Sequence, residues 1–518
     1  MNQGRFITRT ARYHPELPAV IFGDQVMSFL QLERRSSRLA NALLGLGLRK
    51  GDRVAFQMSN RPAIVEIECA LYKAGLVRVP LNARLAPAEV VDVLHNSDPR
   101  VFIVGDSHTD AVQELLDQAG NVEHFISTGT AVSGWHEYEA LLAQASDSSP
   151  DIVMQPDDLA VLHYTSGSTG KLKAAMQTVG NRMSHLRKVG MHRMRVAPGD
   201  VLLLSGPMTH ASGMFIQPFL YQGGAIVIQD HFDPDHLLAA VERWRVTYTF
   251  MVPTMLNRLA THSGLHKHDR SSLRQIAYGG APMAPARIRE AWESLGPVLS
   301  QGYGGGETTG GLILFSTAEH ARAIRERPER LASCGRPIGE SEVRVVNEQG
   351  IEVRGDEIGE IVVRGPDVFA GYWREPELTK AAFDAEGWLR TGDLARLDDE
   401  GFISIVDRSK DMIISGGFNI YPTEVEQALY SHPAVYETCV VGVPDDTWGE
   451  AVKAVVVLRP GQQASSADLV GHCRSLLADF KKPRSVDFVQ ELPKNANGKL
   501  SRKAVREPYW AGRDRRVG

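Results

Sequence analysis

The stretch VAFQMSNRPAIVEIECALYKAGLVRVP, residues 54–80, decides the fold class. Residues 54–58 are typical of a short apolar strand, residues 63–74 of a helix, and residues 76–80 of a second strand. Short apolar strands that alternate with helices build crossover units, in which a helix joins two parallel strands. We therefore expect a mostly parallel sheet with helices packed against it.

The same alternation continues on both sides of this stretch. Upstream, apolar or small residues recur at steps of three and four, which places them on one helical face: Leu32, Ser36, Leu39, Leu43 and Leu46. Downstream, further strand-like runs lie at residues 101–104, 201–205, 225–228 and 248–252. Asp233-Pro234 has the form of a helix start.

The sequence pattern changes in the last third of the chain. Strand-like runs at residues 343–346 and 360–365 lie between Gly-rich turns, which indicates a β-rich subdomain over about residues 333–409. After it, strand-like runs surround one helical segment, as in a small α+β domain.

These patterns predict two domains that meet near the charged segment DRSKD, residues 407–411. The first is an α/β large N-terminal domain over residues 1–409, with parallel sheets, helices and the β-rich subdomain. The second is a small, mobile α+β C-terminal domain over residues 410–518.

The composition is that of an ordinary globular protein. Of the 518 residues, 43% are hydrophobic and 23% charged, which excludes a disordered chain, a collagen-like chain and a coiled coil. The net charge of −5 disfavours a dedicated nucleic-acid binder, which is usually basic. No apolar stretch reaches the roughly 18 residues of a membrane span, and the start lacks an apolar core of signal-peptide length. Four scattered cysteines fit a reducing compartment, so we expect a cytoplasmic enzyme.

The segment YTSGSTGKLK, residues 164–173, is rich in Gly, Ser, Thr and Lys and directly follows an apolar run. The backbone N–H groups, hydroxyls and lysines of such a loop can surround phosphate oxygens. It is not a P-loop of the usual kind, because Thr165 and Leu172 stand where that pattern needs Gly and Ser or Thr. It is not a hydrolase nucleophile elbow, because Ser166 stands where that pattern needs Gly. A phosphate loop is favoured, and a plain polar turn is the alternative.

A second glycine-rich segment, QGYGGGETT, spans residues 301–309. Its glycines let a ligand approach the backbone, Tyr303 offers a ring for stacking on a base, and Glu307 offers a carboxylate for Mg²⁺. A dinucleotide fingerprint that starts at Gly302 needs Gly where Glu307 stands, so that pattern is excluded. A flexible loop with a surface glutamate is the alternative.

Two segments nearer the C-terminus are weaker signals on their own. WLRTGD ends in Asp393, whose carboxylate can accept both hydroxyls of a ribose, although an Asx turn explains the same residues. LPKNANGKL places Lys499 behind an Asn-Gly turn, where a lysine is most often a solvated surface residue.

The order of these segments is more specific than any one of them. The chain contains, in sequence, YTSGSTGKLK, YGGAP (278–282), GYGGGE, TGD, DRSKDMIISGGFNIYP (407–422) and PKNANGK, and this series resembles the adenylate-forming superfamily. The resemblance covers essentially the whole chain. RLASCGRP, GEIVVRG, GYW and SGGFNIYPTEVE make it most similar to the acyl-CoA and aryl-CoA synthetase branch.

The resemblance implies that the protein joins a carboxylic acid to ATP with Mg²⁺, releases pyrophosphate and passes the acyl group to the thiol of coenzyme A. The acid and ATP are both anions, so the site has to neutralise charge and hold the groups in line. A ligase that serves a carrier protein or another nucleophile is the alternative, and a non-catalytic nucleotide-binding homologue is the remote one. Oligomeric state stays open, with a homodimer as one option.

The resemblance also assigns roles to single residues. The phosphates of ATP would be held by Thr165, Ser166, Gly167, Ser168, Thr169 and Gly170, with Lys173 nearby. The adenosine would be held by the backbone of Gly280 and Ala281, the ring of Tyr303 between Gly302 and Gly304, and the ribose-binding pair Asp393 and Arg408. Three residues are assigned to the chemistry: Glu307 would bind Mg²⁺, Lys499 would bridge the carboxylate and the α-phosphate, and His210 would border the acyl site. Gly416 and Gly417 would line the thiol tunnel, and Lys410 would be the hinge.

The sequence departs from the superfamily pattern in three places. Leu172 and Ala174 replace the usual Pro and Gly of the phosphate loop. Gly306 replaces the Thr that usually precedes the magnesium-binding Glu, which leaves residues 304–306 as a wall without side chains. Such a wall favours an aromatic or medium-sized acid, although it could instead accompany unusual chemistry at the adenylate.

Two histidine groups have metal-like residue types but are not expected to bind metal. His231-Phe-Asp-Pro-Asp-His236 is interpreted as a loop followed by a helix N-terminus. The pair His266 and His268 is discounted in the same way.

Overall fold

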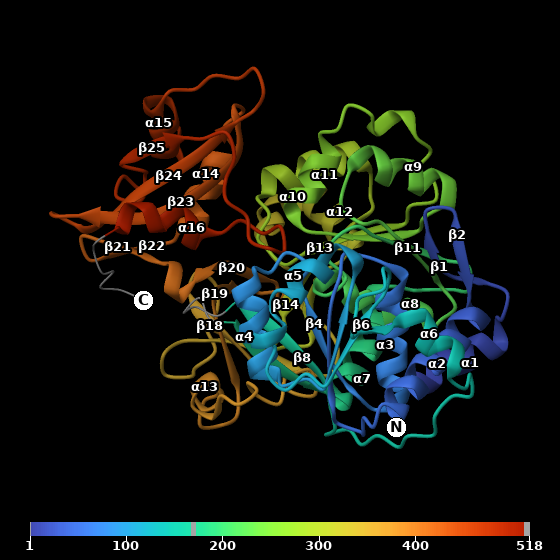
Figure 1. Ribbon diagram of the computed structural model, residues 1–518. Helices are drawn as coiled ribbons and strands as arrows, with labels where there is room; N and C mark the ends of the chain where they lie inside the picture. Colours follow the sequence, from blue (N-terminus) through green and yellow to red (C-terminus); the bar gives the residue numbers. More distant parts are fainter. Residues whose placement is uncertain (1, 167–171, 512–518) are drawn as a thin grey trace.

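The computed structural model describes residues 2–166 and 172–511 of the chain. We call the residues up to Arg408 the large unit and residues 413–511 the small unit, drawn in orange and red at the upper left of Figure 1. The large unit holds a seven-stranded, a nine-stranded and a four-stranded sheet, and the small unit holds a five-stranded sheet. The expected fold class is therefore confirmed.

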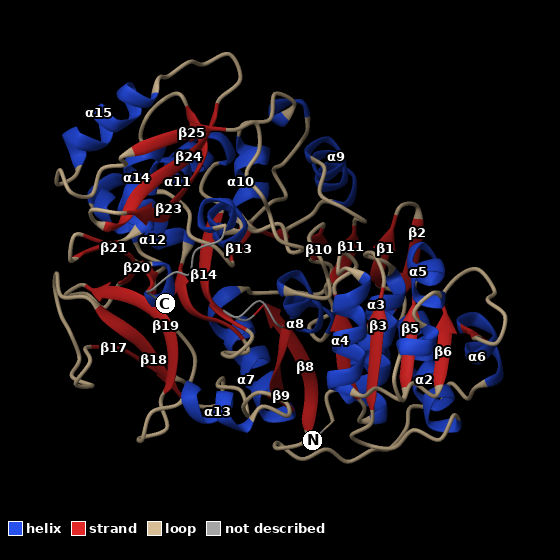
Figure 2. Cartoon of the chain, turned by 60° about the vertical axis from the view of Figure 1, so that its left-hand side comes forward, coloured by secondary structure: helices blue, strands red, loops and turns tan. Residues whose placement is uncertain are grey.

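The seven-stranded sheet contains the stretch that decides the fold class. β3 (Arg53–Gln57) leads through α3 (Pro62–Ala74) into β4 (Val77–Leu81), and the two strands pair in parallel. Across the sheet, the order is β7 (His136–Glu137), β6 (His124–Ser127), β5 (Val101–Val104), β3, β4, β8 (Leu159–Ser166) and β9 (Leu172–Thr178). Figure 2 shows β3, β5 and β6 side by side among the helices.

The nine-stranded sheet contains the downstream strands at the expected places. Its order is β16 (Arg336–Pro337), β15 (Gly310–Phe315), β14 (Leu299–Gly305), β13 (Gln275–Gly279), β12 (Tyr248–Met251), β10 (Val201–Leu204), β11 (Ala225–Ile228), β1 (Pro18–Phe22) and β2 (Gln25–Ser28). The strands from β14 to β1 pair in parallel, so their carboxyl ends share one edge.

Helices separate and cover these two sheets, which gives five layers. Between the sheets lie α1 (Gly4–Tyr13), α2 (Phe29–Gly45), α3, α6 (Tyr138–Gln144), α7 (Val179–Lys188) and α8 (Ile216–Leu220). The outer face of the seven-stranded sheet carries α4 (Pro87–Ser97) and α5 (Thr109–Gln113). The outer face of the nine-stranded sheet carries α9 (Pro234–Trp244), α10 (Pro253–Ala260), α11 (Pro285–Leu295) and α12 (Thr317–Glu326). Among the described residues, no helix is long and apolar enough to cross a membrane.

The rest of the chain forms two antiparallel-rich sheets. The four-stranded sheet consists of β17 (Glu342–Val346), β18 (Gly359–Arg364), β19 (Leu389–Leu397) and β20 (Ile403–Arg408), with α13 (Pro376–Ala382) between β18 and β19. The small unit consists of β21 (Ile413–Ser415), β22 (Phe418–Ile420), β23 (Val435–Asp445), β24 (Gly449–Leu458) and β25 (Ser485–Phe488), with α14 (Pro422–Tyr430), α15 (Ser466–Leu476) and α16 (Arg502–Arg506). The predicted domain boundary at residues 409/410 falls between β20 and β21, and it stays a prediction.

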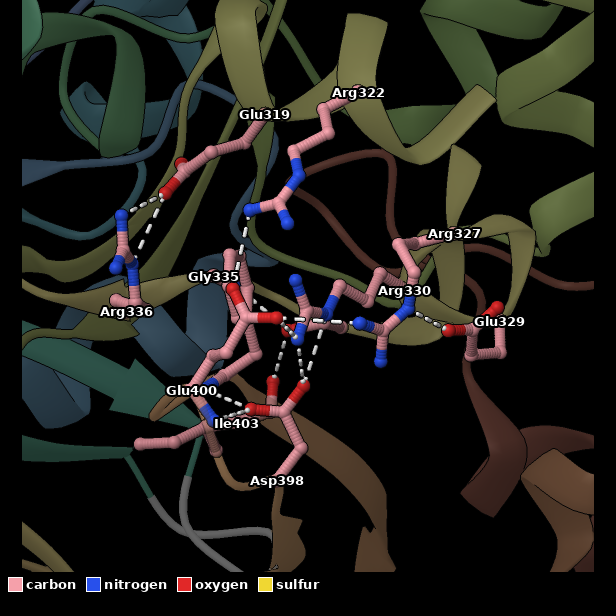
Figure 3. Close-up of polar contacts among 12 residues, drawn as sticks. Glu319, Arg322, Arg327, Glu329, Arg330, Gly335, Arg336, Asp398, Glu400 and Ile403 are labelled. Carbon is pink, nitrogen blue, oxygen red and sulfur yellow. Dashed lines mark hydrogen bonds and ion pairs between the residues drawn. The ribbon is translucent and has the colours of Figure 1, made fainter. Parts of the chain in front are cut away.

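An arginine cluster fastens the β19–β20 turn to the nine-stranded part of the large unit (Figure 3). The buried Arg330 lies 2.9 Å from Asp398 and 2.7 Å from Glu400. Arg322 and Arg327 add ion pairs with Glu400 at 3.1 and 3.2 Å. The hydrogen bond from Arg330 is the main cause that lowers the pKa of Glu400 to about 2.

We expect Arg330→Met to lower the melting temperature at pH 7 by roughly 2–5 °C, because two carboxylates lose their buried cation. The pKa of Glu400 is lowered by folding, so this stabilisation is present above the ordinary value of 4.5 and is lost as the pH falls towards about 2. The melting temperatures of the wild type and of Arg330→Met should therefore approach each other as the pH is lowered from 5 to 3. Arg354→Met, which changes an exposed arginine, is the control. A difference in melting temperature that stays constant over this pH range would contradict the stabilising ion pair between Arg330 and Glu400.

Candidate active site

Lys499 belongs to the small unit, but its side chain reaches the large unit. A Cβ atom built on Gly280 would lie 3.2 Å from Lys499 Nζ, so the ammonium group faces the backbone directly after β13. Gly280 has φ +84°, a conformation that favours glycine. Burial lowers the pKa of Lys499 to about 8, and the nearby charge of Arg408 adds to the effect.

The loop that carries Lys499 is bound by two residues of the large unit, each of which comes shortly after a strand of one of the two large sheets. Asn82, which follows β4, donates from Nδ2 to Asn497 Oδ1 at 2.7 Å. Thr254, in the first turn of α10, donates to the carbonyl of Gly498 at 3.3 Å. Within the loop, Asn495 Oδ1 accepts the N–H of Lys499 at 3.0 Å, which fixes the turn. Lys499 is thus placed at the carboxyl edge of the nine-stranded sheet.

A group of three predicted residues lies at the end of β14. Tyr303 donates from its hydroxyl to Asp393 Oδ2 at 2.6 Å, and Arg408 donates from Nε to Asp393 Oδ1 at 3.0 Å. Burial raises the pKa of the Tyr303 hydroxyl, and the charge of Asp393 raises it further, so the phenol stays protonated as a donor. The neighbouring Gly304 has φ +158°, and a Cβ there would collide with the carbonyl of Gly310.

Glu307 forms the centre of a second group. Tyr372 donates from its hydroxyl to Glu307 Oε1 at 2.9 Å, and Lys173 donates to the Tyr372 oxygen at 2.6 Å. Burial lowers the pKa of Lys173, although the charge of Glu307 opposes this shift. One half-buried carboxylate is a suitable ligand for Mg²⁺, which usually takes one or two protein carboxylates together with substrate phosphates.

His163 and His210 form a stacked pair beside these groups. Their ring centroids lie 4.9 Å apart with planes inclined by 16°. Burial lowers the pKa of His163 to about 3 and also lowers that of His210, so both rings are neutral at pH 7. A Cβ on Gly306 would lie 2.8 Å from His163 Cδ2. The glycine that replaces the usual Thr therefore makes room for a histidine ring.

The junction between the units is held by Arg502, three residues after Lys499. Its Nη2 contacts both carboxylate oxygens of Glu426 at 2.7 and 2.9 Å, and its Nη1 lies 3.4 Å from both Asp407 and Asp411. Lys410 lies between these two aspartates, in the short 3₁₀ turn Ser409–Asp411. A further contact joins Arg459, which directly follows β24, to Glu290 of α11 at 3.0 Å.

The structure brings most of the predicted site residues together, but not all of them. The residues around Lys499 and Asp393 gather at the carboxyl edge of the nine-stranded sheet, and Ala281 follows Gly280 there. Gly416 and Gly417 do not join them, because both are exposed in the small unit, where a Cβ on Gly416 would meet Trp448. Gly167, Ser168, Thr169 and Gly170 lie outside the described residues, and Ser166 ends β8.

The first of the two histidine groups forms a loop followed by the start of α9, as predicted. Asp233 caps α9 by accepting the N–H of His236 at 3.0 Å, and His268 pairs with Glu242 at 2.8 Å. Among the described residues, no group of three or more His, Cys, Asp or Glu side chains is placed to hold a metal ion.

Sequence reasoning missed several residues of the site. Tyr372 lies in the segment GYW, which served as a sign of the family branch but not of a contact with Glu307. His163 was hidden in an apolar strand-like run. Asn82 and Thr254 carry no motif, and only the folded chain shows that they hold the Lys499 loop.

The chain matches two family descriptions. Residues 7–373 match the AMP-binding enzyme family, and residues 424–499 match the AMP-binding enzyme C-terminal domain.

Known proteins resemble the chain over nearly their whole length. A feruloyl-CoA synthase from an Amycolatopsis species is 39% identical over 508 residues, which are 98% of this chain and 99% of that protein. The anthranilate CoA ligase AuaEII, in complex with anthranoyl-AMP, has a TM-score of 0.90 at 26% identity, with 98% of this chain and 97% of the other covered. The amide bond synthetase McbA from Marinactinospora thermotolerans has a TM-score of 0.88 at 30% identity, with 98% and 99% covered. Together with the motif order and the assembled site, these matches show that the chain belongs to the AMP-binding enzyme family, within the adenylate-forming superfamily.

Proposed function

We propose that the protein activates a carboxylic acid with MgATP, forms an acyl-adenylate and pyrophosphate, and transfers the acyl group to the thiol of coenzyme A. The observation that carries this proposal is the placement of Lys499 against Gly280, beside the group formed by Tyr303, Asp393 and Arg408. A carboxylate that attacks the α-phosphate approaches a polyanion. A partly desolvated ammonium group lowers the repulsion most where these two anions meet.

The nucleotide end of the site is formed by rigidly held groups. The ring of Tyr303 stacks on adenine, and the backbone of Gly280 and Ala281 contacts the adenine edge. Asp393 and Arg408 hold the ribose hydroxyls. Their existing hydrogen bonds fix both side chains in advance, which reduces the ordering cost of binding.

The phosphate end combines the Ser/Thr-rich loop with Glu307. Thr165 and the following hydroxyl and backbone groups hold the β- and γ-phosphates, with Lys173 beside them. Glu307 would hold Mg²⁺, which would supply positive charge against the phosphates. Tyr372 keeps the carboxylate of Glu307 oriented through its 2.9 Å hydrogen bond.

The acyl end borders the His163–His210 pair. Because both rings are neutral at pH 7, they offer a flat surface to an apolar or aromatic group rather than a cation to an anion. Of the wall over residues 304–306, Gly304 faces backbone and Gly306 faces His163. The ring of His163 therefore takes part in shaping the acyl site, and an aromatic or medium-sized acid suits this surface.

Coenzyme A is the acceptor that the sequence of the small unit favours. The turn at Gly416 and Gly417 would line the path of the thiol after the small unit rotates and withdraws Lys499, with Lys410 as the hinge. Exposed aromatic side chains surround this turn, among them Phe418 and Trp448. All four cysteines of the chain are free and buried, and we place the enzyme in the reducing cytoplasm.

Transfer to a carrier protein or to another nucleophile is the second candidate. One of the similar structures is named an amide bond synthetase, so the shared fold does not by itself select a thiol. The acceptor is therefore decided by comparing product formation with and without coenzyme A.

We expect pyrophosphate and AMP from ATP, Mg²⁺ and a carboxylic-acid panel, and an acyl-CoA when coenzyme A is added. Release of ADP and phosphate would falsify the adenylation step.

Lys499→Ala should slow adenylation by about 10²–10³ while leaving thioester formation from supplied adenylate nearly unchanged. Because the pKa of Lys499 is about 8, its charge is present below this value, so kcat/KM for adenylation should fall as the pH rises through 8. Equal loss in both half-reactions would contradict the role of Lys499.

Gly306→Thr should reduce kcat/KM for the acid by about tenfold or more, because its Cβ would displace the ring of His163. Combining it with His163→Ala should restore part of the loss. The measurement is a double-mutant cycle on adenylation rates, which reports coupling between residues in contact. Independent, additive effects would show that Gly306 serves the loop backbone instead.

Lys410→Pro should slow one half-reaction and leave the other nearly intact. Proline fixes φ near −65°, so it blocks whichever orientation of the small unit needs another value. Single-turnover adenylate formation and thioester formation from supplied adenylate are measured side by side. Unchanged rates for both would place the hinge elsewhere.

A further inference from the structure

Arg193 is a buried cation to which the motifs assign no role. It ends the π-helix Val189–Arg193 that continues α7, and the residue is only 8% exposed. Its guanidinium lies on the glycine-lined face of the β14–β15 hairpin. A Cβ on Gly302 would lie 2.9 Å from Arg193 Cζ, and one on Gly311 would lie 2.8 Å from Nη1. The ring of Phe215 lies on another side, with its centroid 5.3 Å from Cζ.

Other buried cations nearby face a carboxylate, but Arg193 does not. Lys188 lies 2.7 Å from Asp367, and Arg78 lies 3.3 Å from Glu68. Within the described chain, no carboxylate pairs with Arg193, and its Nε is buried without a hydrogen-bond partner. Burial alone lowers the pKa of Arg193 to about 10, so the side chain is still charged at pH 7. A buried charge without a partner is unfavourable, which points to a partner from outside the chain.

Arg193 is also close to the place where the acid reacts. Gly302, on which the guanidinium lies, pairs with Gly279 of the adjacent strand. The next residue, Gly280, is the one that faces Lys499. Since neighbouring strands are about 4.8 Å apart, the guanidinium lies about one strand away from the backbone at the reaction centre. The two strand positions that pair here, Gly279 and Gly302, carry no side chain that would separate the guanidinium from Gly280.

We propose that Arg193 binds the distal end of the acid, and that this acid carries an oxygen acceptor opposite its reacting carboxylate. This rests on the proposed function and narrows its substrate class. The reacting carboxylate meets Lys499, the body of the acid extends from Gly280 towards the β14–β15 hairpin, and the distal oxygen accepts from the guanidinium beside Phe215. The oxygen is phenolic or carboxylic, since both accept from the fork of N–H donors. A buried donor rejects analogues that lack the acceptor, so Arg193 determines specificity.

The test compares acids of equal shape. 4-Hydroxycinnamate and 4-methylcinnamate have nearly the same shape, but only the hydroxy acid carries a distal oxygen that accepts a hydrogen bond. Wild-type kcat/KM for pyrophosphate release should favour the hydroxy acid by at least about tenfold. Arg193→Met should reduce this preference to less than about twofold with KM for ATP unchanged, and Arg193→Lys should keep part of it. 4-Carboxycinnamate distinguishes a charged from a neutral acceptor.

Arg187→Met is the matched control, because Arg187 lies on α7 but pairs with Glu340 at the surface. It should keep the wild-type preference. Equal use of the hydroxy and methyl acids by the wild type, or an unchanged preference in Arg193→Met, overturns this inference while leaving acid activation intact. Absence of pyrophosphate release with every acid overturns the proposed function instead. If Arg193→Met does not fold, thermal shifts of the wild type decide: equal stabilisation by both acids overturns the inference, and greater stabilisation by the hydroxy acid supports it.

Discussion

The contact between Lys499 and the backbone at Gly280 is the constraint on which the rest of the site depends. It joins a loop of the small unit to the carboxyl edge of the nine-stranded sheet, so the site exists only while the two units are in contact. The loop has no regular secondary structure of its own. Its position is set by hydrogen bonds from Asn82 and Thr254, one from each large sheet.

Electrostatics explain why so many of the charged side chains in this region are paired before any substrate is bound. Asp393 accepts from Tyr303 and Arg408, and Glu307 accepts from Tyr372. These bonds hold the two carboxylates in place. Lys499 differs from these carboxylates in what shifts its pKa. Burial lowers the pKa of Lys499, and the positive charge of the neighbouring Arg408 lowers it further.

The sequence predicts the layered fold well where apolar runs are short and regular. β3, α3 and β4 lie within one residue of the expected ranges, because strands buried on both faces carry continuous apolar residues. The helix expected around Leu32 begins earlier, at Phe29, because Ser28 and Gln31 form a capping box.

The motif order predicted most members of the site but not their partners. Tyr303 and Asp393 are 90 residues apart in sequence, and only packing of the four-stranded sheet brings them together. His163 was not found, because a polar residue in an apolar run carries no local signal of what it faces, and Arg193 was not found because its segment, GMHRMRV, matches no motif. Gly306 faces His163, and Gly302 and Gly311 face Arg193. The sequence alone does not tell which side chain packs against a glycine.

The position of Arg502 has a kinetic consequence. It lies on the same short segment as Lys499, yet it pairs with Asp407 at the end of the large unit, with Asp411 in the short turn between the units and with Glu426 in the small unit. If the small unit rotates as proposed, withdrawal of Lys499 and rearrangement of the ion pairs at the junction are mechanically linked, because Arg502 lies only three residues after Lys499. The strength of the ion pairs around one guanidinium would then govern how often the enzyme exchanges its two working states, and thus the interval between the two chemical steps.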